Sequence, residues 1–356
     1  MLSLVQGIDR VPTLHDSWQV EVEDRIVDNT SRYRAEKERA AMKDIRTHVR
    51  LVTTPHARPL AHFHDKKELL KCVRDIFRIQ SEAFSRHVLY RDCSVGNCMI
   101  EDGPDGPQGC LIDWERAVET TVRGQYDMIG TIPFLSVSLL EQMKAVISSG
   151  HRKTSASESA SFAHSYFMQR STVKYTPSDN IEALLFVLVS IIISYDGPMG
   201  QKRVSDGFDF DESLLAQWSN NGLEDLRSAM YSKFAFLIDR TEDCLVDEIA
   251  PYFEDILKVV EQWRQLHGRA YLTQGQVQFK DVFKILDDFI AEMPDGEKSP
   301  ELQSNSLQLH EDSIAVSQAI SSVNLTSPPP AASKKRLLDV DSMDSELMFS
   351  KCPRTF

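Results

Sequence analysis

Apolar residues fall at helical spacing along residues 66–84 of the chain. The apolar positions in this stretch are Leu69, Leu70, Val73, Ile76, Phe77 and Phe84. Residues three and four positions apart lie on one face of a helix, so this spacing predicts an amphipathic helix. The acidic Asp65 stands at its expected start.

Residues 183–193 (ALLFVLVSIII) form the most apolar stretch of the chain. A membrane-spanning helix needs about 20 such residues, so this shorter run predicts a buried core helix. The sequence TPSD at residues 176–179 offers helix-start chemistry, and we expect the helix to run over residues 180–194. Further helices are expected at residues 211–218, 223–238, 242–268 and 280–292, and good helix formers also fill residues 31–45.

Strand patterns are short and few. Residues 11–22 are a candidate strand, and the alternation in residues 47–53 (THVRLVT) predicts a half-buried strand that the following prolines end. Two short apolar runs, residues 98–100 and 110–112, flank a turn rich in glycine and proline at residues 103–107. This pattern predicts a β-hairpin with a slightly long loop.

These patterns predict an α+β protein with a mainly helical body at residues 61–293. An irregular segment, residues 1–60, precedes it. From Pro294 onward the composition turns to serine, glutamine, proline and charge without periodicity, so residues 294–356 are predicted to be a disordered tail. A serine-rich insertion at residues 148–161 is expected to be mobile.

The chain is acidic, with 53 acidic and 40 basic residues and a net charge of −13. This balance disfavours nucleic acid and anionic membranes as partners. The six cysteines include no CxxC pair and are too sparse for a disulfide framework, and the N-terminus lacks signal-peptide features. We therefore expect an intracellular protein, cytoplasmic or nuclear, with a minimal basic cluster (KKR) at residues 334–336.

Three polar residues stand at ordered spacing between the apolar runs of residues 89–115: Asp92, Asn97 and Asp113. A phosphoryl-transfer site needs a carboxylate that receives a hydroxyl proton, and oxygen ligands that hold Mg²⁺ against a nucleotide's phosphates. This set of side chains meets both needs.

Protein kinases place an Arg-Asp pair behind a long helix, an Asn five residues later, then a hairpin and a second Asp. The same order occurs here. More narrowly, the chain resembles the fungal-type protein kinase family over about residues 47–290. The segments that carry the resemblance are YRDCSVGN (90–97), LIDWE (111–115), GTIPFLS (130–136), NIEALLFVL (180–188) and the hinge-like TTPHARPL (53–60).

The resemblance implies a protein kinase-like fold, with residues 1–60 as the remnant of an N-terminal lobe and hinge and residues 61–293 as the C-terminal lobe. It implies ATP-dependent phosphoryl transfer to Ser/Thr of a protein substrate. Asp92 matches the base, and Arg91 matches an arginine that steadies the activation segment. Asn97 and Asp113 match the ligands of Mg²⁺ and thereby bind ATP.

The sequence also departs from the kinase pattern. No Gly-x-Gly-x-x-Gly precedes Asp92, and no strand carries a Val-Ala-Ile-Lys-like lysine; Lys37 and Lys43 lie in a charged run and are not assigned that role. Tyr90, Ser138 and Asn180 stand where many kinases have histidine, glutamate and aspartate. We expect a looser substrate platform, a weaker loop anchor, and weak or no activity in what looks like a truncated copy or a pseudokinase.

Two other functions stay open. A small-molecule phosphotransferase of the aminoglycoside or choline kinase type shares the three polar residues, but lacks the Gly-Thr-x-Pro-Phe segment that begins here at Gly130. A non-catalytic module that binds a protein partner is favoured by the missing lysine and glycine loop. Arg116 and Arg123 are candidate phosphate contacts, although solvated loop charges are the simpler interpretation of both.

Overall fold

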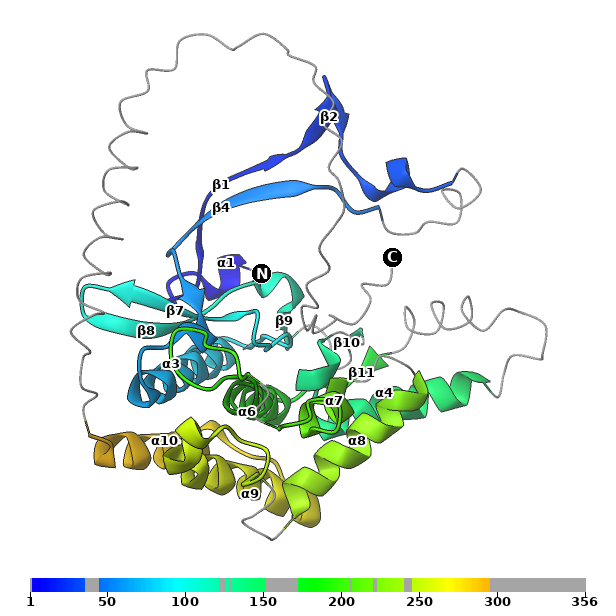
Figure 1. The fold of residues 1–356 in the computed structure, drawn as a ribbon. Coiled ribbons are helices and arrows are strands. Elements are labelled where there is room, and N and C mark those ends of the chain that lie inside the picture. The colour runs from blue at the N-terminus through cyan, green and yellow to red at the C-terminus, as the bar shows by residue number, and fades with distance from the viewer. Residues whose placement is uncertain are drawn as a thin grey trace. The chain divides into compact units, whose positions relative to one another are not determined.

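The computed structural model describes residues 2–35, 45–121, 126–127, 130–151, 172–204, 207–219, 223–239 and 245–294 (Figure 1). Apart from Pro294, these residues belong to one compact unit, Met1–Met293. Its helices and small sheets confirm the predicted α+β class. Several predictions concern residues outside the described part: the tail from residue 295, the insertion from residue 152, Lys37, Lys43, Arg123 and the basic cluster at residues 334–336.

Helix α3, Lys66–Ser85, confirms the helix predicted at residues 66–84. The Asp65 side chain caps it by accepting a hydrogen bond from the backbone N–H of Glu68. Strand β8 lies against this helix so closely that a Cβ atom on Gly109 would stand 2.1 Å from the carbonyl oxygen of Cys72. Only glycine fits at that position.

Helix α6, Pro177–Ser194, is the core helix of the unit and lies at its centre in Figure 1. It begins with a capping box, in which the side chains of Thr176 and Asp179 each bond to the other's backbone. By length and composition it could cross a membrane, but 83% of this 18-residue helix is buried inside the protein. The prediction of a buried core helix at residues 180–194 is confirmed.

The predicted hairpin is present, with longer strands than the sequence indicated. Strand β7, Cys98–Gly103, pairs with β8, Gly106–Leu111, in a register that runs from Cys98–Leu111 to Gly103–Gly106. Gly106 has a positive φ of 101°, which suits the tight turn. Strand β5, Arg58–Pro59, joins the other side of β7 and completes a three-stranded sheet.

A two-stranded ribbon precedes this sheet. Strand β1, Thr13–Gln19, pairs with β4, Val49–Thr54, and the smaller β2, Glu21–Glu23, pairs with β3, Ile26–Val27. The prediction that residues 47–53 form a half-buried strand is wrong in its burial. Every residue of β4 is exposed, because no described element covers either face of the ribbon.

Short elements connect the larger ones. They are α1 (Leu2–Val5), η1 (Thr30–Tyr33), η2 (Leu60–His62), β6 (Val88–Leu89), η3 (Trp114–Arg116), β9 (Val118–Glu119), β10 (Tyr126–Asp127), η4 (Ile132–Phe134), β11 (Thr172–Val173) and η5 (Pro251–Ile256). Strand β6 pairs with β9, and β10 pairs with β11. Good helix formers fill residues 31–45, and in the described part of this stretch the structure has only the single turn η1.

The remaining helices are α4 (Val137–His151), α7 (Leu214–Ser219), α8 (Leu223–Ile238), α9 (Leu257–Thr273) and α10 (Phe279–Glu292). The helix predicted at residues 242–268 is wrong at its start, because Pro251 opens a 3₁₀ turn and the α-helix begins only at Leu257. Helix α4 was not predicted, and it includes the first residues of the insertion expected to be mobile.

Candidate functional site

The loop between β6 and β7 is anchored to the core helix α6. Arg91 adopts a left-handed backbone conformation with φ of 71°, which is unusual for a residue with a side chain. Its backbone N–H donates a hydrogen bond of 3.2 Å to Oδ1 of the buried Asn180. The amide of Asn180 therefore holds the loop at the position where the sequence led us to expect a weaker anchor.

Asp92 follows directly and is partly buried. Two contacts fix it. The Thr131 hydroxyl donates a 3.2 Å hydrogen bond to Asp92 Oδ1, and Nδ2 of Asn97 donates a 2.8 Å hydrogen bond to the Asp92 carbonyl oxygen. The first contact ties the carboxylate to the segment that begins at Gly130, and the second fixes the orientation of the Asn97 amide.

The hairpin register brings Asn97 beside Asp113. The backbone N–H of Ile112 donates a 3.1 Å hydrogen bond to the Asn97 carbonyl oxygen, which extends the β7–β8 ladder by one position. Asp113 comes next, in a left-handed conformation with φ of 59° and ψ of 66°. Its partly exposed carboxylate caps no backbone N–H of the following turn η3.

The donor atoms at this position suit a hard cation. With Nδ2 of Asn97 donating to the Asp92 carbonyl, its Oδ1 remains as a neutral acceptor, and Asp113 adds a carboxylate. Mg²⁺ takes one or two protein oxygens of this kind together with phosphate oxygens and water. Among the described residues there is no cluster of three or more His, Cys, Asp and Glu that suits a metal, so the fit depends on this pair.

Tyr90 and Trp114 are packing groups, as predicted. Their rings meet edge to face with centroids 4.9 Å apart, and both are buried. The Tyr90 hydroxyl donates a hydrogen bond to the carbonyl oxygen of Ile112. Burial raises the pKa of Tyr90 well above its usual value, so the ring stays neutral. It braces the start of the loop against the residue that precedes Asp113.

Two buried ionisable side chains hold the segment over residues 130–136. Lys233 of α8, which is fully buried, donates hydrogen bonds of 3.0 and 2.7 Å to the carbonyl oxygens of Ile132 and Leu135. Glu182 of α6 accepts a 2.8 Å hydrogen bond from the backbone N–H of Val137. A looser segment was expected because Ser138 stands where many kinases have a glutamate. The hydrogen bonds of Lys233 and Glu182 anchor the segment instead.

Glu182 lies in a cluster with the buried His267 and the partly buried Tyr271. The Tyr271 hydroxyl donates a 2.8 Å hydrogen bond to its second oxygen, which also lies 3.5 Å from Nδ1 of His267. Burial raises the pKa of Glu182 to about 8 and lowers the pKa of His267 to about 3. Burial also lowers the pKa of Lys233 well below its usual value. Burial therefore favours the neutral form of each of these three side chains.

Lys233 and Glu182 were not among the predicted site residues, although the sequence places both within apolar helical patterns. Lys233 falls between Met230 and Leu237 at the spacing of the apolar stripe of α8, and Glu182 stands beside the most apolar run of the chain. A charged residue at a buried position of a helical pattern indicates a polar partner inside the core.

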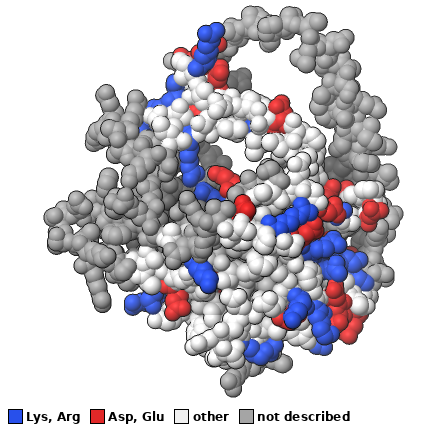
Figure 2. Space-filling view, turned by 180° about the vertical axis from the view of Figure 1, so that it is seen from behind, with Lys and Arg blue, Asp and Glu red and all other residues white. Residues whose placement is uncertain are grey.

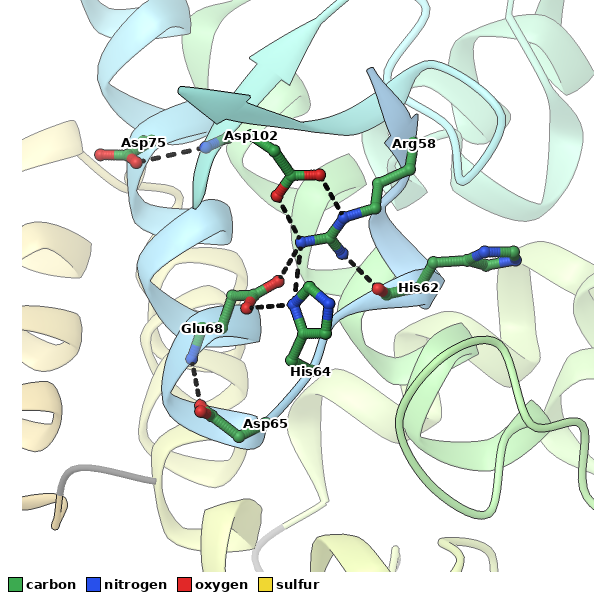
Figure 3. Close-up of polar contacts among 8 residues, drawn as sticks. Arg58, His62, His64, Asp65, Glu68, Asp75 and Asp102 are labelled. Atoms are coloured by element: carbon green, nitrogen blue, oxygen red, sulfur yellow. Dashed lines mark hydrogen bonds and ion pairs between the residues drawn. The ribbon is translucent and has the colours of Figure 1, made fainter. Parts of the chain in front are cut away.

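A further network joins the hinge-like segment to the body (Figure 3). The Arg58 guanidinium donates two hydrogen bonds of 2.9 Å to the Asp102 carboxylate on β7 and one of 2.6 Å to Glu68 on α3. His64 lies 2.9 Å from the other oxygen of Glu68. Burial works to raise the pKa of Glu68, but hydrogen bonds from His64 and Arg58 outweigh it and lower that pKa.

The surface around these elements carries charges of both signs. On the face seen in Figure 2, basic and acidic side chains are interspersed on the described part of the surface. Arg116, for which a solvated loop charge was the simpler interpretation than a phosphate contact, is partly buried, and its backbone oxygen accepts a 2.8 Å hydrogen bond from Nε of Arg91.

Comparison with known proteins identifies the family. A model of the fungal protein kinases matches residues 2–192, a stretch that contains the loop, the hairpin, Asp113 and most of α6. No curated protein matches the chain. The match starts earlier than the resemblance seen in the sequence and ends within α6. Because it covers more than half of the chain, this protein belongs to the fungal protein kinase family.

Proposed function

We propose that this protein transfers the terminal phosphoryl group of Mg-ATP to a Ser or Thr hydroxyl of a protein substrate. One observation carries the proposal: the Asn97 amide is bonded to the Asp92 carbonyl while its backbone pairs with Ile112, the residue before Asp113. These bonds support a site in which the three polar residues act together at the end of one hairpin. Membership of a protein kinase family supports the same reaction class.

In this proposal each residue has one task. Asp92 accepts the proton of the substrate hydroxyl, and its bond from Thr131 aims the carboxylate at the segment over residues 130–136. Asn97 and Asp113 would hold Mg²⁺, which when bound neutralises charge on the ATP phosphates. Arg91 keeps the loop in place through Asn180.

The substrate-binding segment favours a protein over a small molecule. Residues 130–136 run beside Asp92. Lys233 binds two of their carbonyl oxygens, Glu182 accepts from the backbone N–H of the next residue, Val137, and the Ser136 hydroxyl donates a 2.5 Å hydrogen bond to the Asp179 carboxylate. A rigid backbone next to the base suits an extended peptide, because it can position the peptide's hydroxyl beside the carboxylate that accepts its proton. The small-molecule phosphotransferases named above lack this segment.

The missing glycine loop and lysine set the expected rate. Phosphoryl transfer depends on positioning and on stabilising charge, and residues before Asp92 supply no recognisable grip on the ATP phosphates. We therefore propose slow transfer by this chain. The second candidate, a non-catalytic protein-binding module, rests on the same absence.

A labelling experiment tests the proposal. The chain is incubated with Mg²⁺, γ-labelled ATP and a generic basic protein, alone and as Asp92→Asn. Asp105→Asn is the matched control, because Asp105 is an exposed carboxylate at the hairpin turn. We expect label on Ser or Thr with the native chain and the control, and none with Asp92→Asn. Transfer that survives Asp92→Asn would overturn the role of Asp92, and no transfer by any form would favour the binding module.

A further inference from the structure

The guanidinium of Arg91 lies between two tyrosine rings. Its carbon is 5.4 Å from the centroid of Tyr126 and 5.1 Å from the centroid of Tyr175. All three residues are at least nine-tenths buried, with exposed fractions of 7, 8 and 6%. Tyr126 belongs to β10, which precedes the segment over residues 130–136 in the chain, and Tyr175 stands just before α6, which follows it.

The stretch Thr172–Tyr175, here called the strap, reaches this position through backbone contacts. Its strand β11 pairs with β10, Tyr126 opposite Val173 and Asp127 opposite Thr172, and the two strands lie side by side in Figure 1. Gln142 of α4 binds the next residue twice, accepting from the N–H of Lys174 at 2.8 Å and donating to its carbonyl oxygen at 3.1 Å. Tyr175 follows directly.

A buried cation needs compensation, and the two rings contribute to it. The face of an aromatic ring attracts a guanidinium, and the attraction grows when water is excluded. Nε of Arg91 also donates to the Arg116 carbonyl oxygen at 2.8 Å. The backbone of Arg91 bonds to Asn180, and its neighbour is Asp92, so a shift of the guanidinium would move the proposed base.

We propose that Tyr126 and Tyr175 are positioning residues that act through Arg91. Their rings fix the position of the loop at Asp92 relative to the segment over residues 130–136. This arrangement needs no phosphate group on the chain. An arginine that binds a phosphorylated side chain must present its N–H groups to that phosphate. Here the guanidinium lies over two aromatic rings, one contributed by the strap and one by β10.

Hydrogen exchange on the unphosphorylated chain tests the proposal. The chain is produced in bacteria, treated with a phosphatase and compared as native protein, Tyr175→Leu and Tyr175→Phe. Phenylalanine keeps the ring face and leucine does not, so the pair separates cation–π attraction from packing. Tyr231→Leu is the control, because it removes an exposed cation–π pair with Lys144, 5.2 Å away, on the surface of α8.

We expect slow exchange at residues 90–97 and 130–137 in the native chain, Tyr175→Phe and Tyr231→Leu. In Tyr175→Leu the same amides should exchange roughly 5- to 30-fold faster. Equal rates in the leucine and phenylalanine variants, or protection that appears only after phosphorylation, would overturn the proposal. Tyr126→Leu repeats the test on the other ring if Tyr175→Leu does not fold.

A second readout rests on the proposed function. In the labelling assay, Tyr175→Leu should lower kcat while leaving the KM for ATP unchanged, and Tyr175→Phe should restore kcat. A lower kcat in both variants would contradict the role of the ring face. If the native chain transfers no phosphate, the proposed function fails by itself, whereas the exchange experiment still decides the role of the two tyrosines.

Discussion

The Thr131 hydroxyl donates a hydrogen bond to Asp92 Oδ1 across 3.2 Å, joining residues that are 39 positions apart in the chain. Thr131 belongs to the segment that Lys233 and Glu182 hold in place, and Asp92 belongs to the loop that Asn180 holds. The proposed base and the proposed substrate platform therefore share one direct contact.

Replacing Thr131 by valine should slow phosphoryl transfer. Valine keeps the shape of the side chain but cannot donate to Asp92, and a hydrogen bond to a charged group contributes about 1.5–3 kcal/mol. We expect kcat in the labelling assay to fall at least about tenfold. Thr131→Ser keeps the hydroxyl and serves as the control, so equal losses in the two variants would contradict the contact's role.

Replacing Glu182 by glutamine should remove a pH dependence of stability. Burial raises the pKa of Glu182 to about 8, whereas the pKa of a glutamate in the unfolded chain is about 4.3. Between these values the folded state keeps a proton that the unfolded state releases. The contribution of Glu182 to stability is full below pH 4.3 and is lost as the pH rises towards 8, by up to about 1.4 kcal/mol per unit.

Urea unfolding at several pH values between 5 and 8 measures this effect. The difference in unfolding free energy, native chain minus Glu182→Gln, should fall steadily as the pH rises. Contributions from His267 and from other groups shared by both proteins largely cancel in that difference. A difference that stays constant across the range would show that Glu182 is ionised in the folded state.

Arg58→Met should destabilise the protein strongly. The substitution leaves Glu68, whose side chain is 8% exposed, without its guanidinium partner, and breaking a buried pair costs about 3 kcal/mol. Lys284→Met is the matched control, because both side chains of its pair with Asp288 are exposed, and a solvent-screened pair contributes little to stability. Similar losses in the two variants, measured by urea unfolding, would contradict the importance of the network.

Local sequence patterns were sufficient for several elements. The apolar spacing from Leu69 to Phe84 and the cap at Asp65 predicted α3, and the turn residues between Ile100 and Cys110 predicted the hairpin. These elements depend on neighbouring residues alone. Helix α4 was not predicted, although Leu139, Leu140 and Met143 fall at helical spacing. The loop around Pro133 before it and the serine-rich stretch after it both disfavour a helix.

Long-range contacts were beyond the sequence patterns. Arg58 and Asp102 are 44 positions apart, and Lys233 lies about 100 positions from the carbonyl oxygens that it binds. Nothing in the local pattern pairs such residues, since their contact depends on how the elements pack. The exposure of β4 was missed for the same reason: alternation shows that a strand has two faces, and packing decides whether either is covered.

Binding of ATP with and without Mg²⁺ tests the central assignment most directly. Calorimetric titration compares the native chain with Asp113→Asn, and Asp105→Asn again serves as the control. We predict that ATP binds the native chain and the control more tightly when Mg²⁺ is present, and that Asp113→Asn loses this gain. Equal Mg²⁺ dependence in Asp113→Asn and the native chain would contradict the proposed metal–nucleotide site.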